Sequence, residues 1–324
     1  MAIVKCTYCK FIREIGNEHE GKRTKCPLCQ TPLHVQSTVD LVNNLSGEIL
    51  QLHEEILQLK QDVRLTSDEA TKIKSGYAFA NLTSSPIFEN YDDIIRWFKA
   101  KQITVEPDKA AMDISGFFDE IAVKLGDNYA VLSEFCEKIK RVRGGQTQFT
   151  LDIAARNPKD IDIIIKSLKE LYDNAFITRY VHNKYDKKIY ISLQTVPKIV
   201  NFFNGDWLEW YALMKVATLL VDKKVKFSCL RGFQVHFPNQ ERNEIDLFFL
   251  INGKTPLWIE CKSGEFRQFI GKYSTLRKRL QLEKANSLLL VLGMPDEKVV
   301  GLTNTFELTV VNENNFLQHI AQKI

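Results

Sequence analysis

The stretch that decides the fold is NEIDLFFLINGKTPLWIECK, residues 243–262. On both sides of the Asn-Gly pair at 252–253, odd positions from 245 to 261 are apolar except Gly253 and Thr255 at the turn, whereas the charged residues outside the turn stand at even positions. This period-two alternation around Asn-Gly predicts a β-hairpin. A two-residue loop would put Asp246 and Glu260 on opposite faces, whereas a three-residue loop over 251–253 pairs even with even positions. Only the second keeps one face apolar, and burial of that face fixes the register.

This hairpin gathers Asp246, Glu260 and Lys262 on one face at the end away from the turn, with Glu244 further out. Two carboxylates are suitable ligands for Mg²⁺ or Mn²⁺, which keep several waters for a phosphate substrate. A lysine beside them can orient a water or contact the phosphate. The alternative is a simple salt bridge at the end of a half-solvated hairpin. We interpret the three residues as a catalytic site in which Asp246 and Glu260 bind the metal.

These residues resemble the PD-(D/E)XK family of restriction-endonuclease-like proteins. The sequences RNEIDLFFL at 242–250 and LWIECKSGEF at 257–266 resemble the nuclease domain of CRISPR-associated ancillary nucleases, in which a CARF sensor domain precedes the nuclease. The resemblance covers roughly residues 200–324 and has Glu244 where the motif often has proline. It implies endonucleolytic cleavage of DNA, RNA or both in bacterial antiviral defence.

The segment GDWLEWYAL at 205–213 resembles the first helix of that nuclease domain, which makes Glu209 the matching acidic residue. Its implied role is that of an outer metal ligand or a holder of a metal-bound water. The alternative is that a glutamate in a first helical turn only complements the helix dipole.

Composition and charge limit the class of protein. The chain has 324 residues, 44% of them hydrophobic and 26% charged, with a net charge of +4. These values are typical of a soluble globular protein, and the charge is too small to indicate nucleic-acid binding by itself. The N-terminus MAIVKCTYCK lacks the apolar core of a signal peptide, and no apolar run approaches about 18 residues. We therefore expect a cytoplasmic protein without a membrane segment.

Seven cysteines in a cytoplasmic chain are expected to be thiols rather than disulfides. Four of them form two Cys-x-x-Cys pairs separated by sixteen residues: Cys6, Cys9, Cys26 and Cys29. This spacing predicts a tetrahedral structural zinc site in a zinc ribbon whose folding energy comes from the metal. Redox pairs and an iron–sulfur site are the alternatives. The other three, Cys136, Cys229 and Cys261, are expected to be buried thiols.

A heptad pattern follows the zinc ribbon. Val42, Leu45, Ile49, Leu52, Ile56, Leu59 and Val63 recur at alternating spacings of three and four. Val or Ile at position a with Leu at position d favours a parallel two-stranded coiled coil, so residues 42–63 predict a homodimer. An amphipathic helix packed on its own chain, or one that joins a larger bundle, are the alternatives. Residues 64–76 are polar and aperiodic, which indicates a linker.

Residues 77–195 give weaker signals. Helices are predicted at 91–101, 114–125, 129–142 and 158–174, with a strand at 148–153 and a hairpin at 176–193. This order indicates a winged-helix-like α+β domain. Lys184 and Lys187 at the hairpin tip, beside Tyr185 and Lys188, are candidates for phosphate-backbone contacts, although a solvated tip would look the same. The segment has no Gly-rich nucleotide-sensing motif, so it departs from the usual sensor end of the resembled family.

The C-terminal region is predicted to contain a mixed sheet with helices on its faces. Asp206 is the expected N-cap of a helix over 206–221. The remaining predicted elements are a strand at 226–237, a helix at 265–284, a buried parallel strand at 287–292, a strand at 306–311 and a closing helix at 315–324. Basic residues on the helix at 265–284 are either a solvated face or a phosphate track: Arg267, Lys272, Arg277, Lys278, Arg279 and Lys284.

The fold class expected from the whole chain is an α/β mixed-sheet restriction-endonuclease-like domain at the C-terminus, preceded by a zinc ribbon, a short coiled coil and a winged-helix-like domain. The expected boundaries are 1–36, 37–66, a linker at 67–76, 77–197 and 198–324. We predict a homodimeric, metal-dependent endonuclease that acts on nucleic acid. The alternatives are a non-catalytic DNA-binding adaptor with an inactive nuclease-like domain, or a nuclease subunit of a larger defence complex.

Overall fold

The computed structural model describes residues 2–40, 42–43, 91–108, 111, 117–141 and 147–324. The chain divides into two compact units, Met1–Lys74 and Ser75–Ile324, which we describe separately. The predicted coiled coil over 42–63 lies outside the described residues except for its first two positions, and so does the predicted linker. Among the helices that the structure describes, each is too short or too polar to span a lipid bilayer.

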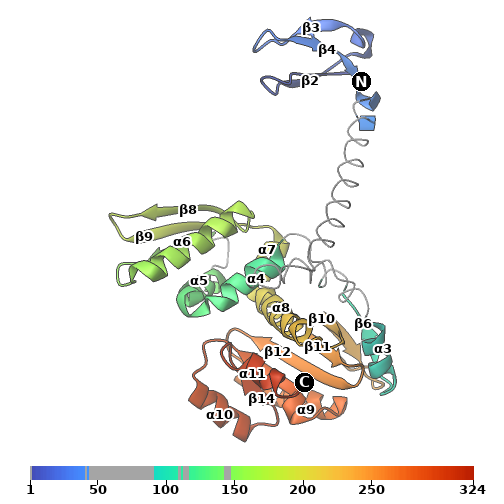
Figure 1. The fold of residues 1–324 in the computed structure, drawn as a ribbon, viewed down its shortest axis with the longest axis vertical. Helices are drawn as coiled ribbons and strands as arrows, with labels where there is room; N and C mark the ends of the chain where they lie inside the picture. The colour runs from blue at the N-terminus through green and yellow to red at the C-terminus, as the bar shows by residue number, and fades with distance from the viewer. Residues whose placement is uncertain (1, 41, 44–90, 109–110, 112–116, 142–146) are drawn as a thin grey trace, which may run out of the picture. The chain divides into compact units, whose positions relative to one another are not determined.

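The first unit is a small ribbon of short strands (Figure 1). One sheet has the order β2-β1-β5, and β3 pairs with β4 in a second ladder. The strands are β1 (Ala2–Lys5), β2 (Ile12–Ile15), β3 (Arg23–Lys25), β4 (Pro32–His34) and β5 (Gln36–Ser37). Its buried core consists of Ala2, Val4, Cys6, Cys26, Leu33 and Val35. Such a small apolar core cannot stabilise a fold without a further cross-link.

In the described part of the second unit, six strands form one mixed sheet in the order β14-β13-β12-β11-β10-β6. The strands are β6 (Thr104–Glu106), β10 (Phe227–His236), β11 (Arg242–Ile251), β12 (Thr255–Lys262), β13 (Ser287–Val291) and β14 (Thr309–Val311). The neighbours β6–β10, β10–β11 and β11–β12 pair antiparallel, and the neighbours β12–β13 and β13–β14 pair parallel. The predicted mixed α/β character and the predicted parallel strand at 287–292 are confirmed.

Helices cover both faces of this sheet (Figure 1). On one face α8 (Trp207–Asp222) and α11 (Phe316–Ala321) pack against side chains such as Leu247, Phe249 and Ile259. On the other face α3 (Asp92–Lys99) and α9 (Ile270–Leu280) pack against Phe248 and Trp258. Because β11 and β12 lie between two cores, their even positions near the turn are apolar too. Burial on both sides makes these two strands the centre of the fold.

The register of the hairpin keeps the predicted parity and shifts its loop. Leu247 pairs with Ile259 and Ile251 pairs with Thr255, so even positions face even positions as expected. The loop is 252–254, one residue later than the predicted 251–253. Asn252 and Gly253 both adopt left-handed φ angles of 51° and 66°, a pair that Asn-Gly supplies at low cost. Ile251 remains in the strand because its side chain is buried in the core.

An additional strand lies on the edge of the sheet. The helix α3 is followed by β6, which pairs with β10 through Val105 and Val235. Ile94 and Phe98 of α3 are fully buried in the same core as Phe248. Residues 92–106, which the sequence analysis grouped with the helical segment, therefore pack on the C-terminal sheet.

A second group of elements precedes α8 and forms a lobe, which we define as residues 117–193. Its elements are α4 (Phe118–Asp127), α5 (Tyr129–Arg141), β7 (Gln148–Asp152), α6 (Pro158–Asp173), β8 (Ile177–Asn183) and β9 (Lys188–Leu193). The strands form a sheet in the order β7-β9-β8 with α6 on one face. Asn157 caps α6 by accepting the N–H of Asp160, and Pro158 occupies its first turn. A short helix α7 (Pro197–Asn201) leads on to α8.

The lobe and the sheet share one continuous core. Buried residues of α4, α5 and α6 belong to the same cluster as those of α8 and of β11. At the closest approach, a Cβ atom added to Gly126 of α4 would lie 2.2 Å from the ring of Tyr211 in α8. Only glycine permits this contact between the two helices.

We predict that Gly126→Ala lowers the free energy of unfolding by about 1–3 kcal/mol, because the new methyl group overpacks the contact with Tyr211. Gly301 of α10 (Asp296–Thr305) is the matched control, since an added Cβ there meets no atom within 4 Å. Gly301→Ala should raise stability by about 0.5–1 kcal/mol through helix propensity. Urea unfolding of both variants measures the difference. Equal stability of the two would contradict the packing account.

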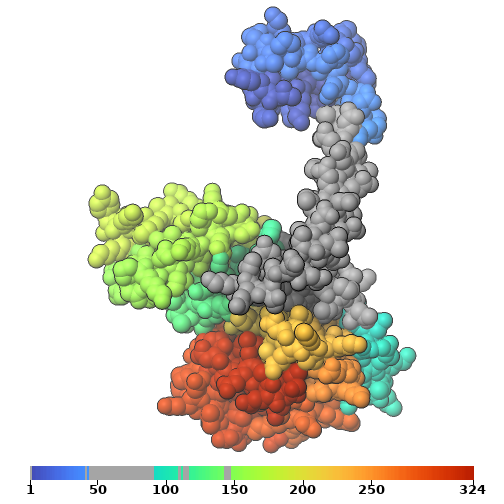
Figure 2. Space-filling view, viewed as in Figure 1, coloured from blue at the N-terminus to red at the C-terminus, as the bar shows by residue number. Residues whose placement is uncertain are grey.

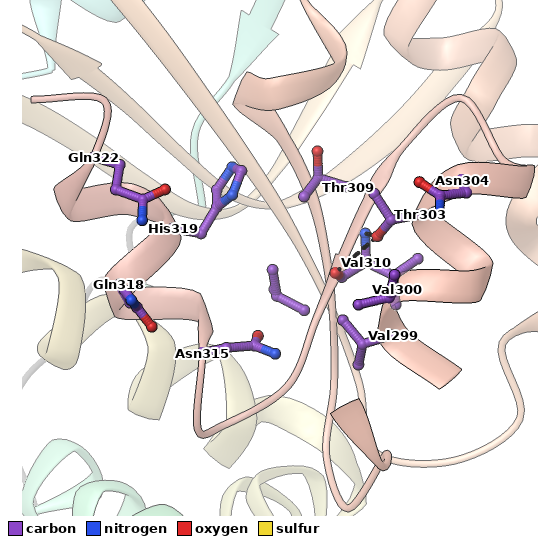
Figure 3. Close-up of a pocket in the computed structure, with 11 residues that line it drawn as sticks. Val299, Val300, Thr303, Asn304, Thr309, Val310, Asn315, Gln318, His319 and Gln322 are labelled. Carbon is purple, nitrogen blue, oxygen red and sulfur yellow. Dashed lines mark hydrogen bonds between the residues drawn. The ribbon is translucent and has the colours of Figure 1, made fainter. Parts of the chain in front are cut away.

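The outer edge of the sheet is closed by a side chain. The Thr303 hydroxyl accepts the N–H of Val310 at 2.9 Å and donates to its carbonyl at 3.1 Å (Figure 3). One residue of α10 thus satisfies the central backbone groups of the edge strand β14. Between α10 and α11 a cavity of about 310 Å³ opens beside this edge, lined by uncharged side chains such as Val299, Asn315 and His319.

Several predicted elements differ in their limits; the strand predicted over 306–311, for example, covers Thr309–Val311. The helix predicted over 265–284 is shorter, because the Glu265 carboxylate accepts the N–H of Arg267 and delays the start, while Gln281 ends the helix with a φ of 55°. Asp206 is not an N-cap. It has a helical φ of −56° and makes no side-chain capping hydrogen bond, and the turn over Phe202–Asp206 that precedes α8 is kinked at Gly205, whose φ is 173°.

Candidate functional site

Four cysteine thiols meet in the first unit. The Sγ atoms of Cys6 and Cys29 are 3.5 Å apart, those of Cys9 and Cys26 are 3.4 Å apart, and all four lie within 4.8 Å of one another. In a tetrahedral site with Zn–S bonds of about 2.3 Å, the sulfurs are separated by about 3.8 Å. The cluster therefore has the donor set and the spacing for one zinc ion.

Both Cys-x-x-Cys turns are closed in the same way. The N–H of Cys6 donates to the carbonyl of Phe11, and the N–H of Lys10 donates back to the carbonyl of Cys6. The second turn repeats these bonds with Cys26, Gln30 and Thr31. A hydrogen bond from the Thr31 hydroxyl, 3.1 Å from Sγ, lowers the pKa of Cys29 to about 6. This favours the thiolate form that binds a metal.

We predict one zinc ion per chain by elemental analysis and its loss in Cys26→Ser/Cys29→Ser. Chelation should expose the amides of residues 2–37 to rapid hydrogen exchange, because the metal replaces a missing core. The amides of β11 and β12 should remain protected, since they lie in a separate unit. Cys136→Ser, which changes a buried thiol far from the cluster in sequence, is the control for zinc content. A ribbon that stays protected without metal would contradict the prediction.

The acidic site lies where β11 and β12 separate. Their paired register ends at Leu247 and Ile259, after which β12 continues along β13 alone. The Asp246 side chain enters the resulting fork, and its Oδ2 accepts the backbone N–H of Cys261 at 2.8 Å. A carboxylate thus replaces the missing strand-to-strand hydrogen bond. This bond fixes Asp246 at the point where the two strands diverge.

The structure brings three of the four predicted catalytic residues together. The Nζ atom of Lys262 lies 3.2 Å from Oδ2 of Asp246 and 3.7 Å from Oε2 of Glu260. The indole N–H of Trp258 donates to Oε1 of Glu260 at 3.1 Å. The Lys262 ammonium also lies 5.6 Å from the ring centre of Tyr273 in α9. Asp246 and Glu260 are buried, whereas Lys262 keeps partial exposure.

Burial and neighbouring charges shift the pKa values of this cluster. Burial, and then the charge of Asp246, raise the pKa of Glu260 well above its ordinary value. Burial alone would lower the pKa of Lys262, but the charges of Asp246 and Glu260 outweigh it and raise the pKa. Two buried carboxylates share one ammonium, so a further cation would relieve the repulsion between them. Carboxylate oxygens are ligands that Mg²⁺ and Mn²⁺ prefer.

Glu209 lies close by and is held by an arginine. Its Oε2 accepts a hydrogen bond from Arg231 at 2.9 Å, in a pair whose side chains are 17% and 5% exposed. Burial first, and then the charge of Asp246, raise the pKa of Glu209 to about 8, although Arg231 opposes the shift. Glu209 is therefore coupled to the other acids by charge. Among the described residues, only the four cysteines form a ligand group of three or more within 4.8 Å.

A glycine turns Arg231 toward this site. The Arg231 guanidinium stacks over Trp210 of α8 and donates from Nε to the carbonyl of Ala111 at 2.7 Å. Phe233, two residues later, lies in the core on the opposite face of the sheet. Residues two apart on a regular strand share a face. Gly232, with a φ of 58°, permits the break in alternation.

A cavity of about 440 Å³ adjoins the acids. Its lining includes Asp206, Glu209 and Glu244 together with Arg231 and Lys198. The acids near the fork outnumber the basic groups, so the electrostatic potential favours a cation there. Asp246, Glu260 and Lys262 do not line this cavity. Glu209, which does, interacts by charge with Asp246, and we take the fork as the candidate active site with this cavity on its α8 side.

The raised pKa of Glu209 predicts a pH dependence of stability. An acid with a pKa near 4.5 when unfolded and about 8 when folded favours the folded state while protonated. This contribution is present below pH 4.5 and is lost as the pH rises through 8. Without added Mg²⁺ or Mn²⁺, the midpoint of thermal unfolding should therefore fall between pH 5 and pH 9, and Glu209→Gln should flatten this fall. Exposed Glu297 of α10 provides the control, Glu297→Gln. An unchanged slope in Glu209→Gln would contradict the assignment.

Comparison with known proteins yields a similarity of fold. No protein-family model matches the chain, and no curated protein matches it. Protein VC1899 from Vibrio cholerae is similar over 71% of this chain and 60% of its own, with 14% identity and a TM-score of 0.47. Can2 from Sulfobacillus thermosulfidooxidans, solved in complex with cyclic tetra-adenylate, is similar over 71% and 59%, with 14% identity and a TM-score of 0.46. The chain spans about three fifths of each of these proteins. Similarity at this level carries no functional inference.

The basic residues predicted on α9 have different environments. Arg277 donates to the carbonyl of Leu282 and to Glu307, and its side chain is 13% exposed. Arg267 pairs with Glu265. Arg279 stacks on Phe237 and pairs with Glu241. Lys272 and Lys278 are exposed, and within the described residues they form no ion pair. These two are the predicted residues of α9 available for a phosphate.

The lobe contacts the site through a lysine. Nζ of Lys140 in α5 donates to the carbonyl and the hydroxyl of Ser263 at 2.5 and 2.6 Å. Ser263 directly follows Lys262, so α5 holds the end of β12. Sequence reasoning missed this contact, as well as Arg231 and the N–H of Trp258. An arginine before glycine inside an apolar strand was the available signal for Arg231.

Proposed function

We propose that the chain is a metal-dependent nuclease of the PD-(D/E)XK type. The supporting observation is the common contact of Lys262 with Asp246 and Glu260 at the fork between β11 and β12. Asp246 and Glu260 would hold Mg²⁺ or Mn²⁺. When bound, the ion supplies a Lewis acid and a water of lowered pKa for phosphodiester hydrolysis.

In this proposal each side chain has a distinct task. The Cys261 N–H orients Asp246, and Trp258 orients Glu260, so both carboxylates are fixed before substrate arrives. Lys262 stays protonated because two carboxylates surround it. Its ammonium can donate to the attacking water or to a phosphate oxygen once the acids bind a cation. The partial exposure of Lys262 leaves that side open to substrate.

Glu209 and Arg231 extend the site on the α8 side. Arg231 donates a hydrogen bond to Glu209, and both side chains are largely buried. We assign Glu209 the role of holding a water beside the carboxylates. The same cavity carries Glu244 and opens to solvent, which gives an outer path for water or a second cation.

The biological setting rests on the resemblance of residues 200–324 to nuclease domains of CRISPR-associated ancillary nucleases. We therefore propose antiviral defence, with DNA or RNA as substrate and a homodimer joined through residues 42–63. In this proposal the chain binds a structural zinc ion in the ribbon in addition to the catalytic Mg²⁺ or Mn²⁺.

The test is Mn²⁺-dependent cleavage of circular single-stranded DNA, circular duplex DNA and RNA by the full chain. Asp246→Asn, Glu260→Gln and Lys262→Met should each lower the cleavage rate by roughly a hundredfold or more, because each removes a group from the fork. Mn²⁺ should raise the unfolding temperature of the wild type and have no such effect on Glu260→Gln.

Glu297→Gln and Lys298→Met on the exposed side of α10 are matched controls and should cleave at the wild-type rate. Cleavage that survives in the Asp246→Asn/Glu260→Gln double variant, or that resists EDTA, would refute the proposed site. Circular dichroism of each variant distinguishes a lost active site from a lost fold.

A further inference from the structure

The three-stranded sheet of the lobe has one buried and one open face. Leu151, Ile189 and Ile191 point into the core against α6. The alternate positions face away from α6 and form three cross-strand rows. The rows are Gln148–Ser192–Arg179, Thr150–Tyr190–Val181 and Asp152–Lys188–Asn183. We call this surface the open face.

An aromatic residue occupies the middle of the open face. Tyr190, on the central strand, is 41% exposed, and Val181 beside it is 39% exposed. A groove of about 400 Å³ runs over Tyr190, Thr150 and Arg179. At the hairpin tip Tyr185 is 98% exposed, and Figure 2 shows the yellow-green hairpin at the outer end of the lobe.

The open face and its tip carry unbalanced positive charge. Arg179, Lys184, Lys187 and Lys188 form no ion pair within the described residues. Two acids on the same surface reduce this excess to two charges. Asp152 accepts the N–H of Ala154, and Asp186 accepts from the Asn183 side chain and, at 3.5 Å, from the Tyr190 hydroxyl. Four unpaired basic groups around exposed tyrosines are complementary to a polyanion that carries aromatic bases.

The opposite surface of the lobe has the reverse character. The exposed side of α6 carries three lysines against four acids. Lys166 pairs with Asp162, and Lys169 pairs with Asp173. A helix with this charge is poorly suited to the major groove of a duplex. The charge distribution therefore favours the sheet over the helix as the nucleic-acid surface.

From these observations we infer that the open face binds single-stranded nucleic acid, with Tyr190 as a stacking platform for a base. Arg179 and the tip lysines contact the phosphates on either side of it. In a duplex the bases stack on one another and present no free face to Tyr190. The inference names an unpaired strand as the nucleic acid that the chain binds. Its connection to cleavage rests on the proposed nuclease function.

The experiment measures anisotropy of labelled oligothymidylate with the full chain carrying Glu260→Gln, without Mg²⁺ or Mn²⁺, so that binding is separated from cleavage. Tyr190→Ala should weaken binding about tenfold, because stacking on one aromatic ring is lost. Tyr190→Phe should retain the affinity, since the ring remains. Arg179→Ala should weaken binding and reduce the salt dependence by about one phosphate contact.

Matched controls lie on the other side of the lobe. Tyr172 of α6 is 50% exposed and contacts Tyr180, which makes Tyr172→Ala the counterpart of Tyr190→Ala. Lys166→Ala is the counterpart of Arg179→Ala. Neither should change the affinity. Oligouridylate replaces oligothymidylate in a parallel series, and tighter binding of either single strand than of a duplex supports the inference.

The inference would be overturned if the chain bound no single strand, or if Tyr190→Ala bound it as tightly as the parent chain. It would also be overturned if Tyr172→Ala lost as much affinity as Tyr190→Ala, or if a duplex bound more tightly than a single strand and depended on Lys166. Failure of the nuclease proposal looks different. A wild-type chain that cleaves nothing, yet binds single strands through Tyr190, would retain the open face and refute the catalytic site. Cleavage that depends on Glu260, together with binding that does not depend on Tyr190, would support the catalytic site and refute the open face as the binding surface.

Discussion

The charged site of the second unit is built around one hydrogen bond at the strand fork, from the N–H of Cys261 to the carboxylate of Asp246. Where β12 leaves β11, its backbone loses a partner, and a buried N–H without a partner costs about 1–3 kcal/mol. A carboxylate meets this need, and it also draws Lys262 to the same point. Glu260 follows because it lies two residues earlier on the same strand. A structural requirement of the sheet thus assembles a charged site inside an otherwise apolar layer.

The lobe and the sheet act on this site together. They share a core, and Gly126 allows α4 to lie directly against Tyr211 of α8. Lys140 of the same lobe holds Ser263, the residue after Lys262. A nucleic-acid strand on the open face would therefore bind to a lobe that is packed against the strand carrying Lys262. The proposed binding surface and the proposed active site belong to one compact unit.

Local patterns in the sequence predicted what local physics controls. Alternation around Asn252-Gly253 gave the correct parity of the hairpin, because a slip of one residue would expose its apolar face. The position of the loop shifted by one residue, since burial of Ile251 outweighed the turn preference. The pairing of β6 with β10 and the contact between Arg231 and Glu209 could not be predicted, because they join residues far apart in sequence. The proximity of Asp246, Glu260 and Lys262 could be predicted because one hairpin carries all three, and their catalytic role stays a prediction.

The central claim is that the fork holds a divalent cation between two carboxylates. Anomalous diffraction from a crystal of the full chain soaked in Mn²⁺ tests it most directly. The account predicts a manganese peak bound by carboxylate oxygens of both Asp246 and Glu260, with Nζ of Lys262 released from Oδ2 of Asp246. A Mn²⁺-soaked crystal with no peak at the fork, and with Lys262 still bonded to Asp246, would contradict it.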